Sequence, residues 1–157
     1  MHRYLLMGIE LAYPTVEKVF SQIPVGRLDE RQDPERFTPR EVAAHLADWE
    51  PILYERLVGA VTVDSFVITP HDEDQRAIDG KYSEQDLKTS LAAYKSAQTK
   101  YLEFARGLSD EQLNRPVIHP ELGTLRAADL ITFQTGHVMY HVHQLLGYTG
   151  EKTTATW

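Results

Sequence analysis

The chain has 157 residues, of which 42% are apolar, and this is enough for one domain around a single substantial core. Its 23 acidic residues outnumber the 16 Lys and Arg residues, and the net charge of -7 repels nucleic-acid phosphates and anionic membrane surfaces. No cysteine occurs, which excludes disulfides, thiolate metal ligands and a cysteine nucleophile.

The amino-terminal segment does not have the pattern of a signal peptide, because His2, Arg3 and Glu10 interrupt its apolar residues. No apolar run approaches the length of a membrane span. We therefore expect a soluble, cytoplasmic protein with no nucleic-acid partner and no membrane partner.

The first three long helices are predicted by apolar spacing and by capping residues. Apolar residues from Leu5 to Ile23 recur at spacings of three and four, which is typical of an amphipathic helix that ends before Pro24. The capping sequence TPRE, residues 38–41, predicts a second helix over about 39–58. A third helix is predicted after the capping pair Ser83 and Asp86, and its apolar stripe continues to Leu108.

The remainder predicts a short helical turn, a connector and a last helix. Ser109 and Gln112 indicate the extra turn, and the prolines and glycine of residues 116–123 indicate an irregular connector. Thr124 is expected to cap a fourth long helix that ends at Gly147. The segment VTVDSFVIT, residues 61–69, is the best β-like candidate, although an extended loop is the favoured interpretation.

Four long helices around one core predict an all-α fold, a four-helix bundle, with residues 1–157 as a single domain. The segment of about residues 59–82 is long enough to cross the bundle. Such a crossover would let the second and third helices run parallel, with the fourth antiparallel to the second.

Three of the seven histidines lie in the stretch GHVMYHVHQL of the last predicted helix. His137 and His141 are four residues apart, so they differ by only ~40° around the helix and by about 6 Å along it. Both imidazoles can reach one ion, whereas His143 lies ~200° around from His141 and should face elsewhere. Since such a pair can also line a partly wet helix face, a third ligand must come from another element.

His45 is the candidate third ligand, because it lies on an apolar stripe of the second helix with Val42 and Trp49. If the fourth helix runs antiparallel to the second, the start of the second helix and the end of the fourth lie at the same end of the bundle. His45 then lies ~9 Å from that end, and His137 and His141 lie ~13 and ~7 Å from it. These heights agree, although His45 taken alone is more often a hydrogen-bonded core histidine.

Two further residues are candidates to orient these imidazoles. Asp48 and Gln144 each follow a histidine by three residues and rotate to nearly the same helix face. Either could accept the second ring proton of its histidine. The alternatives are a solvated carboxylate for Asp48 and a surface amide for Gln144.

The segments TPREVAAHLADWE and GTLRAADLITFQTGHVMYHVHQLLG together resemble the DinB/YfiT-like family of four-helix-bundle metalloenzymes (DinB superfamily). In that family one metal-binding histidine comes from the second helix and an H-x-x-x-H pair from the last. The resemblance implies His45, His137 and His141 as metal ligands, with Gln144 matching the glutamine that often follows the pair. It also implies an up-down-down-up topology and, in many members, a homodimer.

Three neutral imidazoles suit one divalent ion, Zn²⁺ or Ni²⁺, and leave a coordination position open for water or a substrate. The resemblance implies a metal-dependent enzyme acting on a small molecule, either a hydrolase or a transferase that uses a low-molecular-weight thiol as cosubstrate. A non-catalytic metal-binding stress-response or interaction protein is the alternative, and a polar seam that serves only oligomerisation is a third. The sequence assigns no catalytic base.

Overall fold

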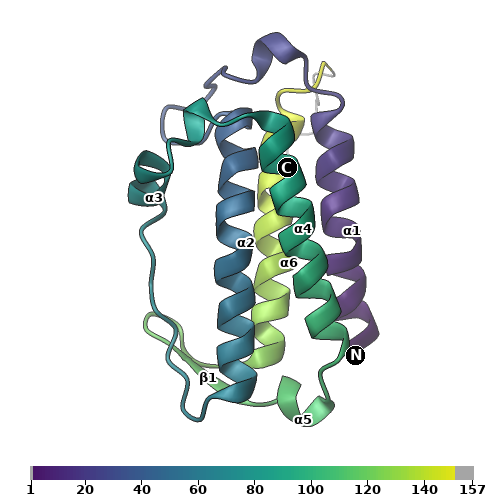
Figure 1. Ribbon diagram of the computed structural model, residues 1–157, viewed down its shortest axis with the longest axis vertical. Coiled ribbons are helices and arrows are strands. Elements are labelled where there is room, and N and C mark those ends of the chain that lie inside the picture. Colours follow the sequence, from purple (N-terminus) through teal and green to yellow (C-terminus); the bar gives the residue numbers. More distant parts are fainter. Residues whose placement is uncertain (1, 151–157) are drawn as a thin grey trace.

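The computed structural model describes residues 2–150; residue 1 and residues 151–157, which the single-domain prediction includes, lie outside the described part. Four long helices form its body: α1 (His2–Phe20), α2 (Pro39–Thr62), α4 (Leu87–Arg106) and α6 (Ala127–Leu146). Figure 1 shows α1 and α6 running in one direction and α2 and α4 in the other. The predicted all-α four-helix bundle is confirmed.

Shorter elements connect the long helices. They are η1 (Val25–Arg27), α3 (Glu73–Asp79), η2 (Tyr82–Glu84), α5 (Asp110–Leu113), β1 (Pro116–His119) and β2 (Gly123–Arg126). The segment from α2 to α4, which contains α3, returns along the outside of the bundle beside α2 (Figure 1). Within residues 2–150 no helix has an apolar stretch long enough to cross a membrane.

Thr38 and Asp86 are the N-caps of α2 and α4, whereas Ser83, which was predicted to form a capping pair with Asp86, lies in η2. Glu41 N donates to Thr38 Oγ1 at 3.3 Å, and Thr38 N donates to Glu41 Oε2 at 2.8 Å, which closes the capping box of α2. Asp86 caps α4 by accepting a hydrogen bond of 2.9 Å from Thr89 N. The second helix continues to Thr62, beyond the predicted end at 58, because residues 59–61 are buried and pack in the core.

The predicted start of the last helix was wrong, as was the irregular connector before it. Residues 116–119 and 123–126 form an antiparallel hairpin in which Ile118 faces Thr124. Thr124 is therefore a strand residue, and Arg126 is the N-cap of α6, with its N–H donating to Asp129 Oδ2 at 2.8 Å. Strands of four residues are too short to show a period-2 pattern in the sequence.

The β-like segment 61–69 is partly helical and partly extended. Its first two residues end α2, whereas Ile68 N donates to Ile118 O and Ile118 N donates to Phe66 O, each at 2.9 Å. The favoured interpretation as an extended loop therefore describes residues 66–68, which lie against the hairpin. This contact brings the hairpin alongside the C-terminal end of α2.

The buried apolar residues form two clusters along the bundle, and a polar layer lies between them. One cluster includes Leu57 and Ile131, and the other includes Leu46 and Val138. In the layer, Gln134 Nε2 donates to Glu50 Oε1 at 3.0 Å, and both side chains are almost fully buried. The bundle thus encloses a carboxyl group that no cation neutralises within the described residues.

Glu50 makes the stability of the fold depend on pH. Burial raises the pKa of Glu50 to about 8, although the hydrogen bond from Gln134 acts to lower it. Since the folded pKa lies above the unfolded value of 4.5, this group's contribution to stability is complete below pH 4.5 and is lost as the pH rises through 8.

We expect Glu50→Gln to leave the free energy of unfolding near the wild-type value at pH 5 and to raise it by about 1–3 kcal/mol at pH 9. Urea unfolding at pH 5, 7 and 9 measures this. The matched control is Glu55→Gln, which changes an exposed carboxylate of the same helix. An equal effect of Glu50→Gln at every pH would show that the carboxyl group does not titrate as described.

The surface of α1 is the best candidate for the expected homodimer. Tyr4, Met7 and Leu11 are 78%, 41% and 58% exposed, and their spacing of three and four residues places them on one face. The outward residues of α4 are mostly charged or small. We expect a dimer in sedimentation velocity, converted to a monomer by Leu11→Glu but not by the α4 control Ala92→Glu. A monomeric wild type would contradict the expectation.

Candidate metal centre

The structure brings together the three histidines that the sequence singled out. His45 Nε2 lies 2.9 Å from His137 Nε2, which lies 3.2 Å from His141 Nε2. All three can each offer a ligand atom within 4.8 Å of the others. His143, as predicted from its direction, is exposed on the other side of α6.

The spacing of these nitrogens fits a single bound ion. Three zinc–nitrogen bonds of ~2.0–2.1 Å at tetrahedral angles separate the ring nitrogens by roughly 3.3 Å. One proton can join only one pair of facing nitrogens, so a lone pair is left without a donor among these three rings. A divalent ion would satisfy all three, and the donor set suits Zn²⁺ or Ni²⁺.

The three imidazoles are neutral at neutral pH, which metal binding requires. Burial, and then the neighbouring His141 and His137, lowers the pKa of His45 to about 2. Burial and His141 lower the pKa of His137 to about 3. Burial lowers the pKa of His141 to about 4, although the hydrogen bond to Gln144 acts to raise it.

Gln144 makes the contact that its spacing predicted. Its Oε1 lies 3.2 Å from His141 Nδ1, and because an amide oxygen can only accept, the ring proton sits on Nδ1. The Nε2 lone pair of His141 is therefore free to face the other histidines. Gln144 Nε2 also donates to Phe37 O at 2.7 Å, which ties the end of α6 to the start of α2.

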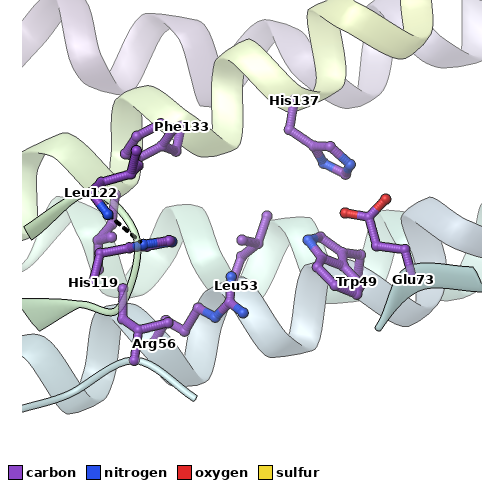
Figure 2. Close-up of a pocket in the computed structure, with 10 residues that line it drawn as sticks. Trp49, Leu53, Arg56, Glu73, His119, Leu122, Phe133 and His137 are labelled. Atoms are coloured by element: carbon purple, nitrogen blue, oxygen red, sulfur yellow. Dashed lines mark hydrogen bonds between the residues drawn. The ribbon is translucent and has the colours of Figure 1, made fainter. Parts of the chain in front are cut away.

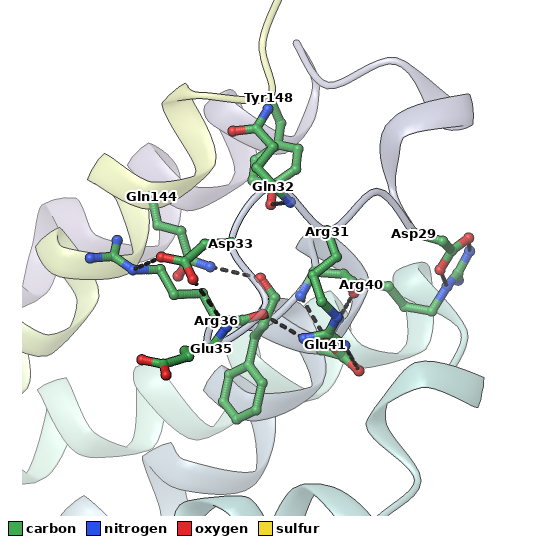
Figure 3. Close-up of polar contacts among 12 residues, drawn as sticks. Asp29, Arg31, Gln32, Asp33, Glu35, Arg36, Arg40, Glu41, Gln144 and Tyr148 are labelled. Atoms are coloured by element: carbon green, nitrogen blue, oxygen red, sulfur yellow. Dashed lines mark hydrogen bonds and ion pairs between the residues drawn. The ribbon is translucent and has the colours of Figure 1, made fainter.

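Polar contacts tie the loop between α1 and α2 to both helices of the site (Figure 3). Arg31 Nη2 donates to both carboxylate oxygens of Glu41, at 2.9 and 2.8 Å. Gln32 Nε2 donates to Gly147 O at 3.0 Å, just beyond α6. The capping box of α2 and the end of α6 are thus joined through one loop, and both helices carry histidines of the site.

Asp48 does not orient a histidine, which corrects the sequence-based expectation. Its carboxylate accepts two hydrogen bonds of 2.7 Å from Arg76 and one of 2.5 Å from Tyr82. A two-pronged guanidinium contact is stronger than one from a neutral imidazole, so Arg76 takes the carboxylate. Burial alone would raise the pKa of Asp48, but these partners bring it below its usual value.

The contacts of Asp48 anchor α3 and η2 to α2 beside the histidines. Tyr82 is buried, and Phe37 and Trp49 also lie against His45, with ring centroids 5.2 and 5.4 Å away. The Nδ1 atoms of His45 and His137 are buried without a hydrogen-bond partner among the described residues. Gln144 is therefore the one side chain that orients a histidine of this centre within residues 2–150.

A cavity of about 190 Å³ opens beside His137, and we call it the histidine cavity. Its walls are mainly apolar, and they come from α2, α6, the β1–β2 hairpin and the segment before α3 (Figure 2). Its apolar lining residues are Trp49, Leu53, Ile68, Leu122, Leu130 and Phe133. His137 therefore faces a space that a small molecule can enter.

Three polar residues of this cavity were missed in the sequence, namely Arg56, Glu73 and His119. Arg56 follows His45 by eleven residues, which is only ~20° around a helix, so both residues lie on the same face of α2. A charged residue on that apolar face was the signal in the sequence that could have identified Arg56. Glu73 and His119 lie in connectors that carry no periodicity. Only the return of these connectors to the bundle places them beside the histidines.

Glu73 lies between two hollows at the centre. It lines the histidine cavity and also a smaller, polar hollow of about 110 Å³ beside His141. Figure 2 shows its carboxylate directed toward the space between His137 and Trp49. Burial and the neighbouring Asp74 raise the pKa of Glu73, and Arg56 acts to lower it.

With this geometry established, the sequence match is decisive, since residues 9–145 match the DinB superfamily. The chain belongs to the DinB superfamily. A relative from Oceanobacillus iheyensis, named "Putative metal-dependent hydrolase", is 30% identical over 106 residues, which are 68% of this chain. The match spans only 61% of that relative's own length.

Solved structures of similar proteins show the same fold. YfiT from Bacillus subtilis, described as a probable metal-dependent hydrolase with an unusual four-helix bundle topology, superimposes with a TM-score of 0.84 at 21% identity, covering 93% of this chain and 85% of YfiT. A mycothiol-dependent maleylpyruvate isomerase has a TM-score of 0.74 at 16% identity, covering 92% of this chain and 60% of the isomerase. At such identities the likeness establishes the DinB-type bundle alone.

We expect the purified, untagged protein to carry about one divalent ion per chain, because three ligands converge. His45→Ala should lose most of this metal, whereas the control His143→Ala, on the exposed side of α6, should retain it. Elemental analysis of the two variants and the wild type measures the difference. An unchanged metal content in His45→Ala would show that His45 is not a metal ligand. An equal loss of metal in His143→Ala would contradict the predicted direction of His143, away from the site.

Proposed function

We propose that this DinB-superfamily protein is a divalent-metal-dependent hydrolase for a small molecule, with His45, His137 and His141 as the metal ligands. The observation that carries the proposal is the convergence of three neutral imidazole nitrogens beside a cavity that opens to one side. A site with three protein ligands and an open side is the arrangement of catalytic zinc, whereas structural zinc is closed by four. The names of the relatives point in the same direction.

A bound ion would supply Lewis-acid chemistry and would lower the pKa of a water or thiol that enters the open side. The protein's own groups would do the rest. The Glu73 carboxylate, directed toward the space beside His137, is placed to accept a proton from the entering nucleophile. Its raised pKa brings a carboxylate closer to the neutral range in which a base is most useful.

A thiol-dependent transferase is the second candidate. It is favoured by the likeness to a mycothiol-dependent isomerase and by the absence of cysteine, so that a thiol nucleophile would have to be a bound small molecule. Both candidates need the same ligands and the same base. They differ in whether water or a low-molecular-weight thiol attacks the substrate.

We expect Glu73→Gln to lower hydrolysis of p-nitrophenyl acetate and related small esters by about 10²–10⁴-fold, the usual contribution of a general base. Its metal content should stay at the wild-type level, because Glu73 is not among the metal ligands. The control is Asp79→Asn, which removes an exposed carboxylate at the other end of α3. An unchanged rate in Glu73→Gln, with the wild type active, would remove Glu73 from the reaction.

The cobalt-substituted protein separates the two candidates and the non-catalytic alternative. Titration with cysteine, N-acetylcysteine and glutathione should change its visible spectrum if a thiol reaches the open side, and the change should grow with pH as the thiol proton is released. A spectral change with thiol conjugation favours the transferase, and ester hydrolysis without it favours the hydrolase. Metal binding with neither activity would favour a metal-binding protein without turnover.

A further inference from the structure

Among the described residues, Arg56 is a half-buried cation that contacts no carboxylate, although Glu73 acts on its charge from a longer distance. Among residues 2–150 no ion pair includes it, and its one hydrogen bond is from Nη2 to the carbonyl oxygen of Thr69, at 3.0 Å. Its Nε–H is buried and has no hydrogen-bond partner. A guanidinium that is partly removed from water and left unpaired is costly, and such groups are normally found with an anion.

The position of Arg56 relates it directly to the histidine cavity. Its guanidinium lies over the Trp49 ring, at 5.7 Å from the centroid, and the same indole lies 6.5 Å from the His137 ring. Figure 2 shows the Arg56 side chain extending along the cavity toward Trp49. Trp49 therefore lies between the arginine and the histidines, and a small molecule could reach both.

His119 offers a second donor at the same end of the cavity. The N–H groups of Glu121 and Leu122 both approach its Nδ1, each at 3.2 Å, so Nδ1 accepts and the ring proton is on Nε2. Figure 2 shows this ring beside Arg56, with one of the two contacts drawn. An N–H donor and a guanidinium on one wall are suited to an anionic oxygen pair.

We propose that the Arg56 end of the histidine cavity binds the carboxylate of a small organic acid, whose apolar body lies against Leu53 and Phe133. This inference rests on the proposed function in one respect, since it assigns the opposite, reactive end of the same molecule to the histidines. A singly charged ligand is favoured over a dianion such as a phosphate monoester, because the Glu73 carboxylate lines the same cavity and repels additional negative charge.

Binding of simple probes tests this assignment without requiring turnover. The probes are hexanoate and phenylacetate, the neutral amides of both, and phenyl phosphate. Each is titrated into zinc-loaded and metal-free protein, and the indole N–H resonance of Trp49 reports on the cavity wall. We expect both carboxylates to shift this resonance in both forms of the protein, and the amides and phenyl phosphate to bind about tenfold more weakly.

Substitution of the arginine gives the decisive comparison. Arg56→Gln should weaken carboxylate binding about tenfold in both forms and should leave the weak amide binding unchanged. Arg56→Lys keeps the positive charge but loses the planar guanidinium, so its carboxylate affinity should lie between those of the wild type and Arg56→Gln. Arg106→Gln is the control for net charge, because Arg106 is paired with Glu10 and lines a different hollow. Thermal melting establishes that each variant is folded.

Several outcomes would overturn the inference. They are carboxylate affinity unchanged by Arg56→Gln, amides or phenyl phosphate that bind as well as the carboxylates, and no carboxylate binding to either form. Carboxylate binding that requires zinc and ignores Arg56 would overturn it while supporting the metal centre. Binding that depends on Arg56 in a protein that takes up no metal would support it and would instead refute the proposed metal-dependent function.

Discussion

The packing of α2 against α6 at the height of His45 and His137 is the constraint on which the site depends. The two helices run in opposite directions, so only one relative height brings the second turn of α2 beside the second half of α6. Gln144 fixes this height by binding both His141 Nδ1 and the carbonyl of Phe37. A shift of one helical turn, about 5.4 Å, would separate the imidazoles beyond the reach of one ion.

Two groups of buried polar side chains in the bundle have different consequences. In the first group, His137 lines the histidine cavity, His141 lines the smaller polar hollow, and His45 is fully buried. Glu50 and Gln134 face the interior, where the amide satisfies only part of the carboxyl group and the charged form is disfavoured. Burial keeps the histidines neutral by lowering their pKa values, whereas the buried Glu50 carboxyl group has a stability cost that grows as the pH rises.

The segments that connect the long helices supply residues that line the histidine cavity. Asp48 holds α3 to α2 through Arg76 and Tyr82, and α3 carries Glu73 to the edge of the metal centre. The hairpin, held against residues 66–68, carries His119 to the other end of the same cavity. The candidate metal ligands therefore come from helices of the bundle, and the residues proposed to face a substrate come partly from segments wrapped around it.

The sequence by itself predicted the four long helices and the pair His137 and His141, because apolar periodicity, capping residues and the i, i+4 histidine spacing are local properties. His45 was added from the expected bundle topology and the family resemblance, which are not local. The sequence also predicted the contact of Gln144, since three residues on a helix fix a direction. Only the tertiary structure decided the partner of Asp48, the hairpin at residues 116–126 and the roles open to Arg56, Glu73 and His119. In each case the deciding neighbour lies far along the chain, and local spacing carries no information about which distant group reaches a side chain first.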